Sequence, residues 1–160
     1  MSKKLQHWFL RVWVYDRAGA LTSIASAFSN RGISIDSVVG HGVDKKAGCD
    51  GTVLVTFRCT EDDKDAIKRV VRRLSKVKKV EEHPYLSENL RKVIVAKVKR
   101  ELSPKDVAGK TRFITCELMK KDSTGWTYFL AGSPNQLDPI LKKLEKSGLF
   151  IDQVYSITAL

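Results

Sequence analysis

The sequence predicts an α+β fold built from two ferredoxin-like βαββαβ units. Its 160 residues fit two small domains. Strand-like and helix-like patterns follow one another in the order β-α-β-β-α-β over the first half, and the same order recurs more loosely over the second half. The polar stretch 87–89 lies between the halves as a candidate linker, so we expect one domain over residues 1–86 and another over residues 87–160.

The first half predicts four strands and two helices. Apolar side chains alternate along the strands and recur at intervals of three and four residues along the helices. We expect Gly32 to end the first helix in the left-handed conformation and Thr60 to cap the second. The predicted strands are residues 8–15, 33–41, 52–58 and 77–84. The predicted buried stripes are Leu21, Ile24, Ala25 and Phe28 on the first helix, and Ile67, Val70, Val71 and Leu74 on the second.

The second half repeats this order with a shortened first helix. Ser103 and Pro104 open a short helix or turn that ends near Lys110. Ser133 and Gln136 have the spacing of a capping box, which predicts the start of the second helix. The predicted strands are residues 92–98, 113–119, 126–131 and 150–157. The buried stripe predicted for the second helix is Leu137, Ile140, Leu141 and Leu144.

The net charge of +11 is the unusual feature of the composition. The basic residues are spread over 64–79 and 91–112 and are mixed with acidic ones, which favours solvated basic faces over a nucleic-acid site. No apolar run reaches the roughly 18 residues of a membrane span, and three cysteines at unrelated spacings indicate a reducing compartment. The N-terminus has no signal-peptide pattern, so we expect a cytoplasmic protein, or a stromal one if a transit peptide was removed.

Signals for catalysis and metal binding are poor. The three histidines, His7, His41 and His83, have no partner at ligand spacing, and HExxH, CxxC, GxSxG and P-loop motifs are absent. The stretch with His41, Asp44 and Cys49 is more typical of a polar loop than of a metal site. We therefore expect no active site, no metal and no cofactor.

The junction between the first strand and the first helix is the candidate ligand site. Gly19 lets a ligand approach the backbone, and the free N–H groups of Ala20 and Leu21 at the helix start favour a carboxylate. Asp16 lies one short loop away and could hold an ammonium group. Together these two poles suit a free amino acid. The alternative is structural: Gly19 serves a tight turn, and Asp16 caps the helix.

The same residues resemble the ACT domain. In that family Asp-Arg-Pro-Gly or Asn-Glu-Pro-Gly precedes a helix, and Arg-Gly-x-Asn-Ile begins the second strand. The corresponding residues here are Asp-Arg-Ala-Gly at 16–19 and Arg-Gly-Ile-Ser-Ile at 31–35. Further stretches resemble the small regulatory subunits of acetolactate synthase, namely residues 25–32, 35–37, 126–132, 136–138 and 155–160.

This resemblance implies that the first domain is an amino-acid-sensing ACT domain and the second a looser ferredoxin-like copy. It also implies a homodimer that forms through the ACT domains and binds valine or a related branched-chain amino acid at their interface. Such a chain would activate a separate thiamine-diphosphate-dependent catalytic large subunit. Asp16 and Ser34 replace the asparagines of the family, Ala18 replaces its proline, and Gly19 matches. The candidate ligand-binding residues are Asp16, Gly19, Ala20, Leu21, Ser34 and Ile35.

Two other functions stay open. One is a stand-alone tandem ACT sensor that acts on a different partner. The other is an RNA-binding ferredoxin-like protein, because residues 12–15 resemble the first-strand motif of the RNA-recognition module. That module stacks bases on aromatic side chains of its third strand, where this chain has Thr52 and Leu54. The sequence therefore disfavours nucleic acid as a partner.

Overall fold

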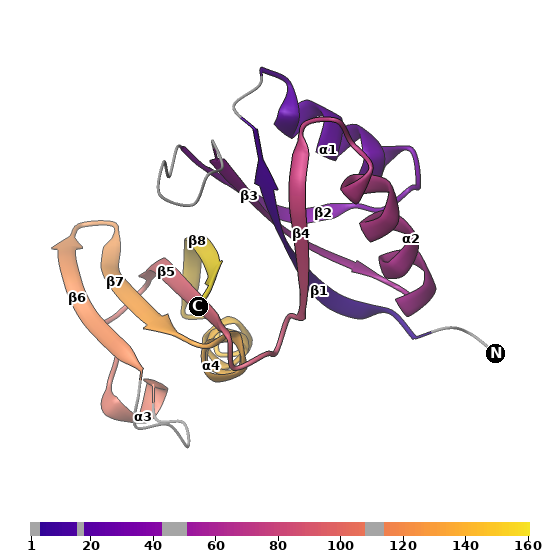
Figure 1. The fold of residues 1–160 in the computed structure, drawn as a ribbon. Helices are drawn as coiled ribbons and strands as arrows, with labels where there is room; N and C mark the ends of the chain where they lie inside the picture. The colour runs from indigo at the N-terminus through magenta and orange to yellow at the C-terminus, as the bar shows by residue number, and fades with distance from the viewer. Residues whose placement is uncertain (1–3, 16–17, 43–50, 108–113) are drawn as a thin grey trace. The chain divides into compact units, whose positions relative to one another are not determined.

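The computed structural model describes residues 4–15, 18–42, 51–107 and 114–160. It divides into two compact units, Met1–Tyr85 and Leu86–Leu160 (Figure 1). Each unit has its own four-stranded antiparallel sheet and its own helices. This confirms the predicted α+β class with two ferredoxin-like units.

The first unit is an antiparallel sheet with two helices on one face. Its elements in chain order are β1 (Gln6–Val14), α1 (Ala20–Ser29), β2 (Ile35–His41), β3 (Gly51–Cys59), α2 (Glu61–Arg72) and β4 (Val77–Pro84). The strands lie in the order β2-β3-β1-β4, so β2 and β4 are the edges of the sheet. Helices α1 and α2 lie side by side (Figure 1).

The helix starts and ends of the first unit follow the sequence signals. The Thr60 side chain accepts a hydrogen bond from the Asp63 N–H at 3.2 Å, which confirms it as the cap of α2. Three acidic residues occupy the first turn of α2, where they stabilise the positive end of the helix dipole. Gly32, which follows α1, has a φ of +65° and so takes the predicted left-handed conformation.

The core of the first unit shows that the stripe predicted for α1 was wrong at two positions. Leu21 and Ala25 are exposed, whereas Ala20 and Ala27 are buried together with the predicted Ile24 and Phe28. Positions 20, 24, 27 and 28 satisfy helical spacing as well as the predicted set does, and the small alanines let the helix lie close to the sheet. The stripe predicted for α2 is confirmed, with Ile67 and Val71 buried and Val70 and Leu74 packed against the core.

The second unit repeats the architecture with a much shorter first helix. Its elements are β5 (Leu90–Val98), α3 (Pro104–Val107), β6 (Thr115–Asp122), β7 (Gly125–Gly132), α4 (Pro134–Lys146) and β8 (Phe150–Ala159). The strands lie in the order β6-β7-β5-β8. The strand predicted over 113–119 begins at Thr115 and continues to Asp122, because the hairpin turn occupies only residues 123–124. The predicted capping box of α4 and its buried stripe are both confirmed.

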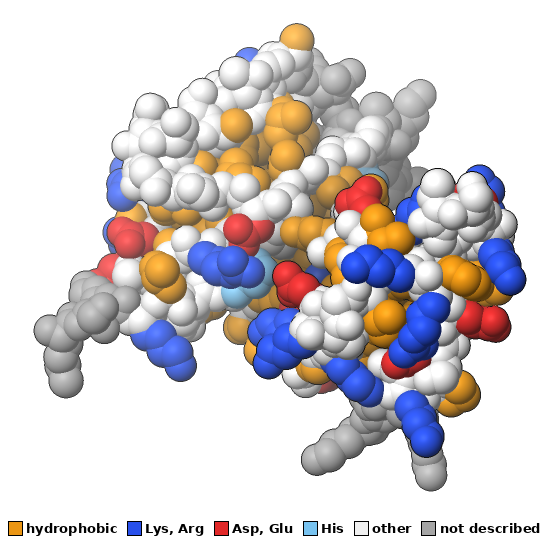
Figure 2. Space-filling model, turned by 180° about the vertical axis from the view of Figure 1, so that it is seen from behind, with side chains coloured by type: hydrophobic (Ala, Val, Ile, Leu, Met, Phe, Trp, Pro, Cys, Tyr) orange, Lys and Arg blue, Asp and Glu red, His pale blue; other side chains and the backbone are white. Residues whose placement is uncertain are grey.

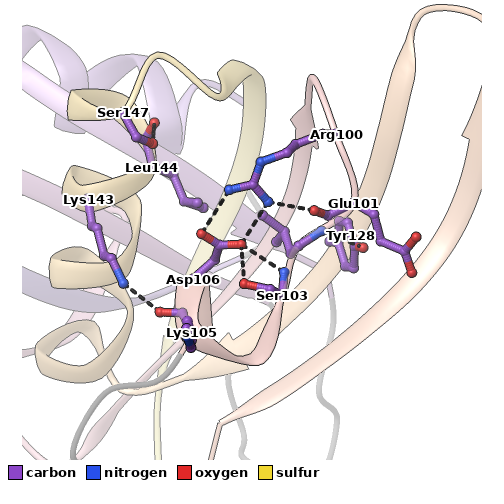
Figure 3. Close-up of polar contacts among 10 residues, drawn as sticks. Arg100, Glu101, Ser103, Lys105, Asp106, Tyr128, Lys143, Leu144 and Ser147 are labelled. Carbon is purple, nitrogen blue, oxygen red and sulfur yellow. Dashed lines mark hydrogen bonds and ion pairs between the residues drawn. The ribbon is translucent and has the colours of Figure 1, made fainter.

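A cluster of polar contacts around Asp106 fixes the segment between β5 and α3 (Figure 3). Its carboxylate accepts hydrogen bonds from the Ser103 N–H at 2.7 Å and from the Arg100 guanidinium at 2.8 and 3.1 Å. The Tyr128 hydroxyl accepts the Leu102 N–H at 3.0 Å. Hydrogen bonds hold the pKa of Asp106 well below its usual range, with the largest effect from Arg100 and the next from Ser103. The cluster thus fastens the short α3 to the rest of the unit.

Within the described residues, no helix is both long enough and apolar enough to cross a membrane.

Candidate functional site

The turn between β1 and α1 presents an open helix N-terminus. Gly19 is the N-cap of α1 with a φ of +83°, and no side chain caps this helix. The Gly19 carbonyl accepts hydrogen bonds from the Ser23 N–H and the Ser23 hydroxyl, both at 2.9 Å. No acidic side chain lies in the first turn, so the N–H groups of Ala20 and Leu21 face no carboxylate of their own helix. This arrangement suits the carboxylate of a ligand.

Lys76 adds a positive charge at the same turn, and no local pattern in the sequence predicts this position. Its ammonium group donates a hydrogen bond to the Ala18 carbonyl at 2.7 Å. It lies 3.1 Å from the place that a Cβ on Gly19 would occupy. The backbone holds Lys76 there, since its carbonyl accepts the Tyr15 N–H at 3.0 Å. Lys76 and Ala18 are 58 residues apart in sequence, so only the packing of the end of α2 against the start of α1 brings them together.

The predicted residues Ser34 and Ile35 lie elsewhere in the unit. They line a shallow groove of about 350 Å³ with residues from the C-terminal half of α1. Helix α1 has 10 residues and is therefore about 15 Å long. Within one chain, Ser34 and Ile35 thus lie at the opposite end of α1 from Gly19, and the structure does not bring the two halves of the predicted site together.

The remaining predicted site residues differ in how much of their surface is exposed. Ala20 is buried, so only its backbone is available to a ligand, whereas 46% of the Leu21 surface is exposed. Asp16, the predicted partner of an ammonium group, lies outside the described residues. The structure therefore describes only the anion-binding pole of the predicted site.

The described residues contain no group of three His, Cys, Asp or Glu side chains that could hold a metal ion. His41 lies at the end of β2, and Asp44 and Cys49 fall outside the described part of the chain. Burial raises the pKa of the Cys59 thiol to about 11. This thiol therefore stays protonated at neutral pH and is a poor nucleophile.

Strand β3 lacks the stacking platform of an RNA-recognition module. Its single aromatic residue, Phe57, is fully buried on the helix side of the sheet, where its ring meets Phe28 edge-on at a centroid distance of 4.9 Å. Leu54 is also buried. No aromatic side chain of β3 is thus available for base stacking.

The first unit is thus a ferredoxin-like βαββαβ unit with a glycine turn before an uncapped helix N-terminus. Residues 8–76 match the family model of the ACT domain. The first unit therefore contains an ACT domain, and such domains are regulatory rather than catalytic.

A solved structure of the same fold covers both units. The acetolactate synthase small subunit from Thermotoga maritima is 15% identical with a TM-score of 0.69, and the match covers 97% of this chain and 96% of that one. The regulatory subunit of aspartate kinase from Thermus thermophilus is 16% identical with a TM-score of 0.47, over 89% of this chain and 94% of that one. At 15% identity the likeness to the Thermotoga maritima protein shows the fold alone. No curated protein matches the sequence.

Proposed function

We propose that this chain is the regulatory subunit of an acetolactate synthase in branched-chain amino-acid biosynthesis. It binds the catalytic large subunit, has no active site of its own, and senses valine or a related amino acid in the cytoplasm or an organelle stroma. The observation that carries the sensing role is the uncapped start of α1 with Lys76 beside it. The motifs at 16–19 and 31–35 support the choice of enzyme, as does a fold shared with an acetolactate synthase small subunit over both units.

The proposed ligand is a zwitterion bound at the turn. Its carboxylate accepts hydrogen bonds from the Ala20 and Leu21 amides, with the Lys76 ammonium close by. Its ammonium group lies toward Asp16. Gly19 leaves space for the ligand carboxylate, because a Cβ at this position would lie between the turn and the Lys76 ammonium group.

A homodimer would complete this site. Ser34 and Ile35 lie too far along α1 to reach a ligand at Gly19 of the same chain, but a two-fold axis beside α1 brings them there from a second copy. The surface for such a contact is open. Leu21 is 46% exposed and Val38 is 43% exposed, and Val38 lies on the edge strand β2 opposite the core residue Val55. An uncovered edge strand with apolar neighbours favours pairing with another copy.

Three measurements test this proposal. Titration calorimetry with valine, leucine and isoleucine should give heat for at least one of them, and light scattering at tens of micromolar protein should give the mass of a dimer. Affinity purification from the native source should recover a large thiamine-diphosphate-dependent enzyme. Recovery of a different enzyme, together with amino-acid binding, would favour the tandem ACT sensor instead. A stable monomer that gives no heat would contradict the proposed site.

A further inference from the structure

The end of α2 carries the densest positive charge of the chain. Residues 68–79 include no acidic residue, and their basic members are Lys68, Arg69, Arg72, Arg73, Lys76, Lys78 and Lys79. The second unit differs: on the face shown in Figure 2, its Lys and Arg side chains stand among acidic and hydrophobic ones. The two units carry similar net charges, +6 over residues 1–85 and +5 over residues 86–160, but the first unit concentrates its basic residues in one segment.

Some of these basic side chains already have partners. Lys68 pairs with Glu82 at 3.0 Å, Lys79 pairs with Glu81 at 2.5 Å, and Lys76 binds the Ala18 carbonyl. The arginines do not. Among the described residues no carboxylate lies within ion-pair distance of Arg69, Arg72 or Arg73, or of Arg31 just after α1. The Asp65 carboxylate, one turn before Arg69, interacts with its charge at longer range. Four guanidinium groups are thus left for solvent or for a partner.

Arg31, just after the end of α1, lines a groove between the two helices. The groove measures about 450 Å³ and is lined by Ala27, Asn30, Arg31 and Val70. Arg73 lies three residues after Val70 and therefore one turn along the same side of α2. Arg69 and Arg72 are exposed on the outer face of α2, turned away from the buried Ile67 and Val71. The three arginines at the end of α2 thus share its exposed face, beside the apolar Val70 of the groove.

Helix stability accounts for only part of this charge. Arg69 and Arg72 lie in the last turn of α2, where a cation stabilises the negative end of the helix dipole. Arg31 belongs to another element, and each further unpaired guanidinium repels its neighbours. A partner that carries carboxylates would remove this repulsion.

The dimensions favour a protein partner over a nucleic acid. From Arg69 to the C-cap Arg73, α2 rises about 6 Å, which spans only about two phosphates of one strand. Stacking is not available on β3, since Phe57 is buried. The guanidinium fork matches a carboxylate in bidentate geometry, and the apolar floor at Ala27 and Val70 suits a side chain of a peptide.

We propose that Arg69, Arg72 and Arg73, on the exposed face of α2 beside the groove, form a docking surface for an acidic, Asp- or Glu-rich segment of the protein that this chain regulates. This inference rests on the proposed function only for the identity of that protein. The chemistry of the surface is independent of it.

The direct test uses a synthetic fluorescent peptide with alternating Glu and Leu residues and the full chain. Its binding, followed by anisotropy at low salt, should weaken about tenfold or more in the double variant R69Q/R72Q. The matched control is K142Q/K146Q, which removes the same number of charges from exposed positions of α4 in the second unit and should change the affinity little. Equal weakening in the two double variants would overturn the proposal, and so would tighter binding of a single-stranded RNA of the same charge.

A second measurement separates this inference from the proposed function. If the acetolactate synthase catalytic subunit is the partner, R69Q/R72Q should bind it more weakly while its heat of valine binding stays unchanged. If that subunit does not bind the wild-type chain, the choice of enzyme fails, and the peptide experiment still decides the docking surface. A variant that loses valine binding along with the partner would point to a general folding defect and would count against a local docking role.

Discussion

Replacing Gly19 by alanine should destabilise the first unit by about 2 kcal/mol and weaken the binding of an amino acid at the turn. Gly19 has a φ of +83°, and a residue with a Cβ loses roughly 1–2 kcal/mol in the left-handed region. The new methyl would lie 3.1 Å from the Lys76 ammonium. That group must shift, which strains its 2.7 Å hydrogen bond to Ala18, an interaction worth about 1 kcal/mol.

The chain offers a matched control for the backbone part of this loss. Gly32 has a φ of +65°, and a Cβ built there meets no atom within 4 Å. Gly32→Ala should therefore lose only the conformational contribution, about 1 kcal/mol. Gly148, with a φ of +67° and equally open surroundings, provides the same control in the second unit and should leave ligand binding unchanged.

Urea unfolding followed by tryptophan fluorescence and circular dichroism measures these differences, and calorimetry with valine measures binding. Trp8 and Trp13 report on the first unit and Trp126 on the second. The expected order of destabilisation in the first unit is Gly19→Ala above Gly32→Ala. Equal losses would show that Lys76 moves aside freely, and unchanged binding in Gly19→Ala would refute the placement of the ligand at this turn.

Three further predictions concern single side chains. Lys76→Gln should weaken amino-acid binding about fivefold or more by removing a charge beside the carboxylate, whereas Lys142→Gln should not; calorimetry compares them. Asp106→Ala should destabilise the second unit by about 1 kcal/mol at neutral pH. Because folding lowers the pKa of Asp106, its contribution to the free energy of unfolding is complete above the unfolded pKa of about 3.9 and is lost as the pH falls through the folded pKa. If wild type and Asp106→Ala still differ in stability in strong acid, the carboxylate is not the source of the stabilisation. Thr60→Ala should cost about 1 kcal/mol through loss of the α2 cap, and Thr60→Ser should restore most of it in thermal unfolding.

Local signals in the sequence predicted the elements of the fold well. The order of strands and helices, the cap at Thr60, the capping box at Ser133 and the left-handed Gly32 all depend on residues a few positions apart. The buried stripes of α2 and α4 also depend on local spacing. In each helix the large aliphatic residues lie on a single face, so only that face can be buried. Interactions between residues three or four positions apart can be predicted from the sequence, because helix and strand geometry determine which side chains are neighbours.

The sequence by itself determined the two βαββαβ units and the glycine turn that precedes α1. Only the tertiary structure decided which way α1 faces, burying Ala20 and Ala27 and exposing Leu21 and Ala25, because two stripes with equal spacing compete and the fit of the helix against the sheet selects one. It also brought Lys76 to Gly19 and placed Ser34 at the far end of the helix. Contacts between residues distant in sequence arise from the packing of α1 and α2 on one sheet, and no local spacing encodes them.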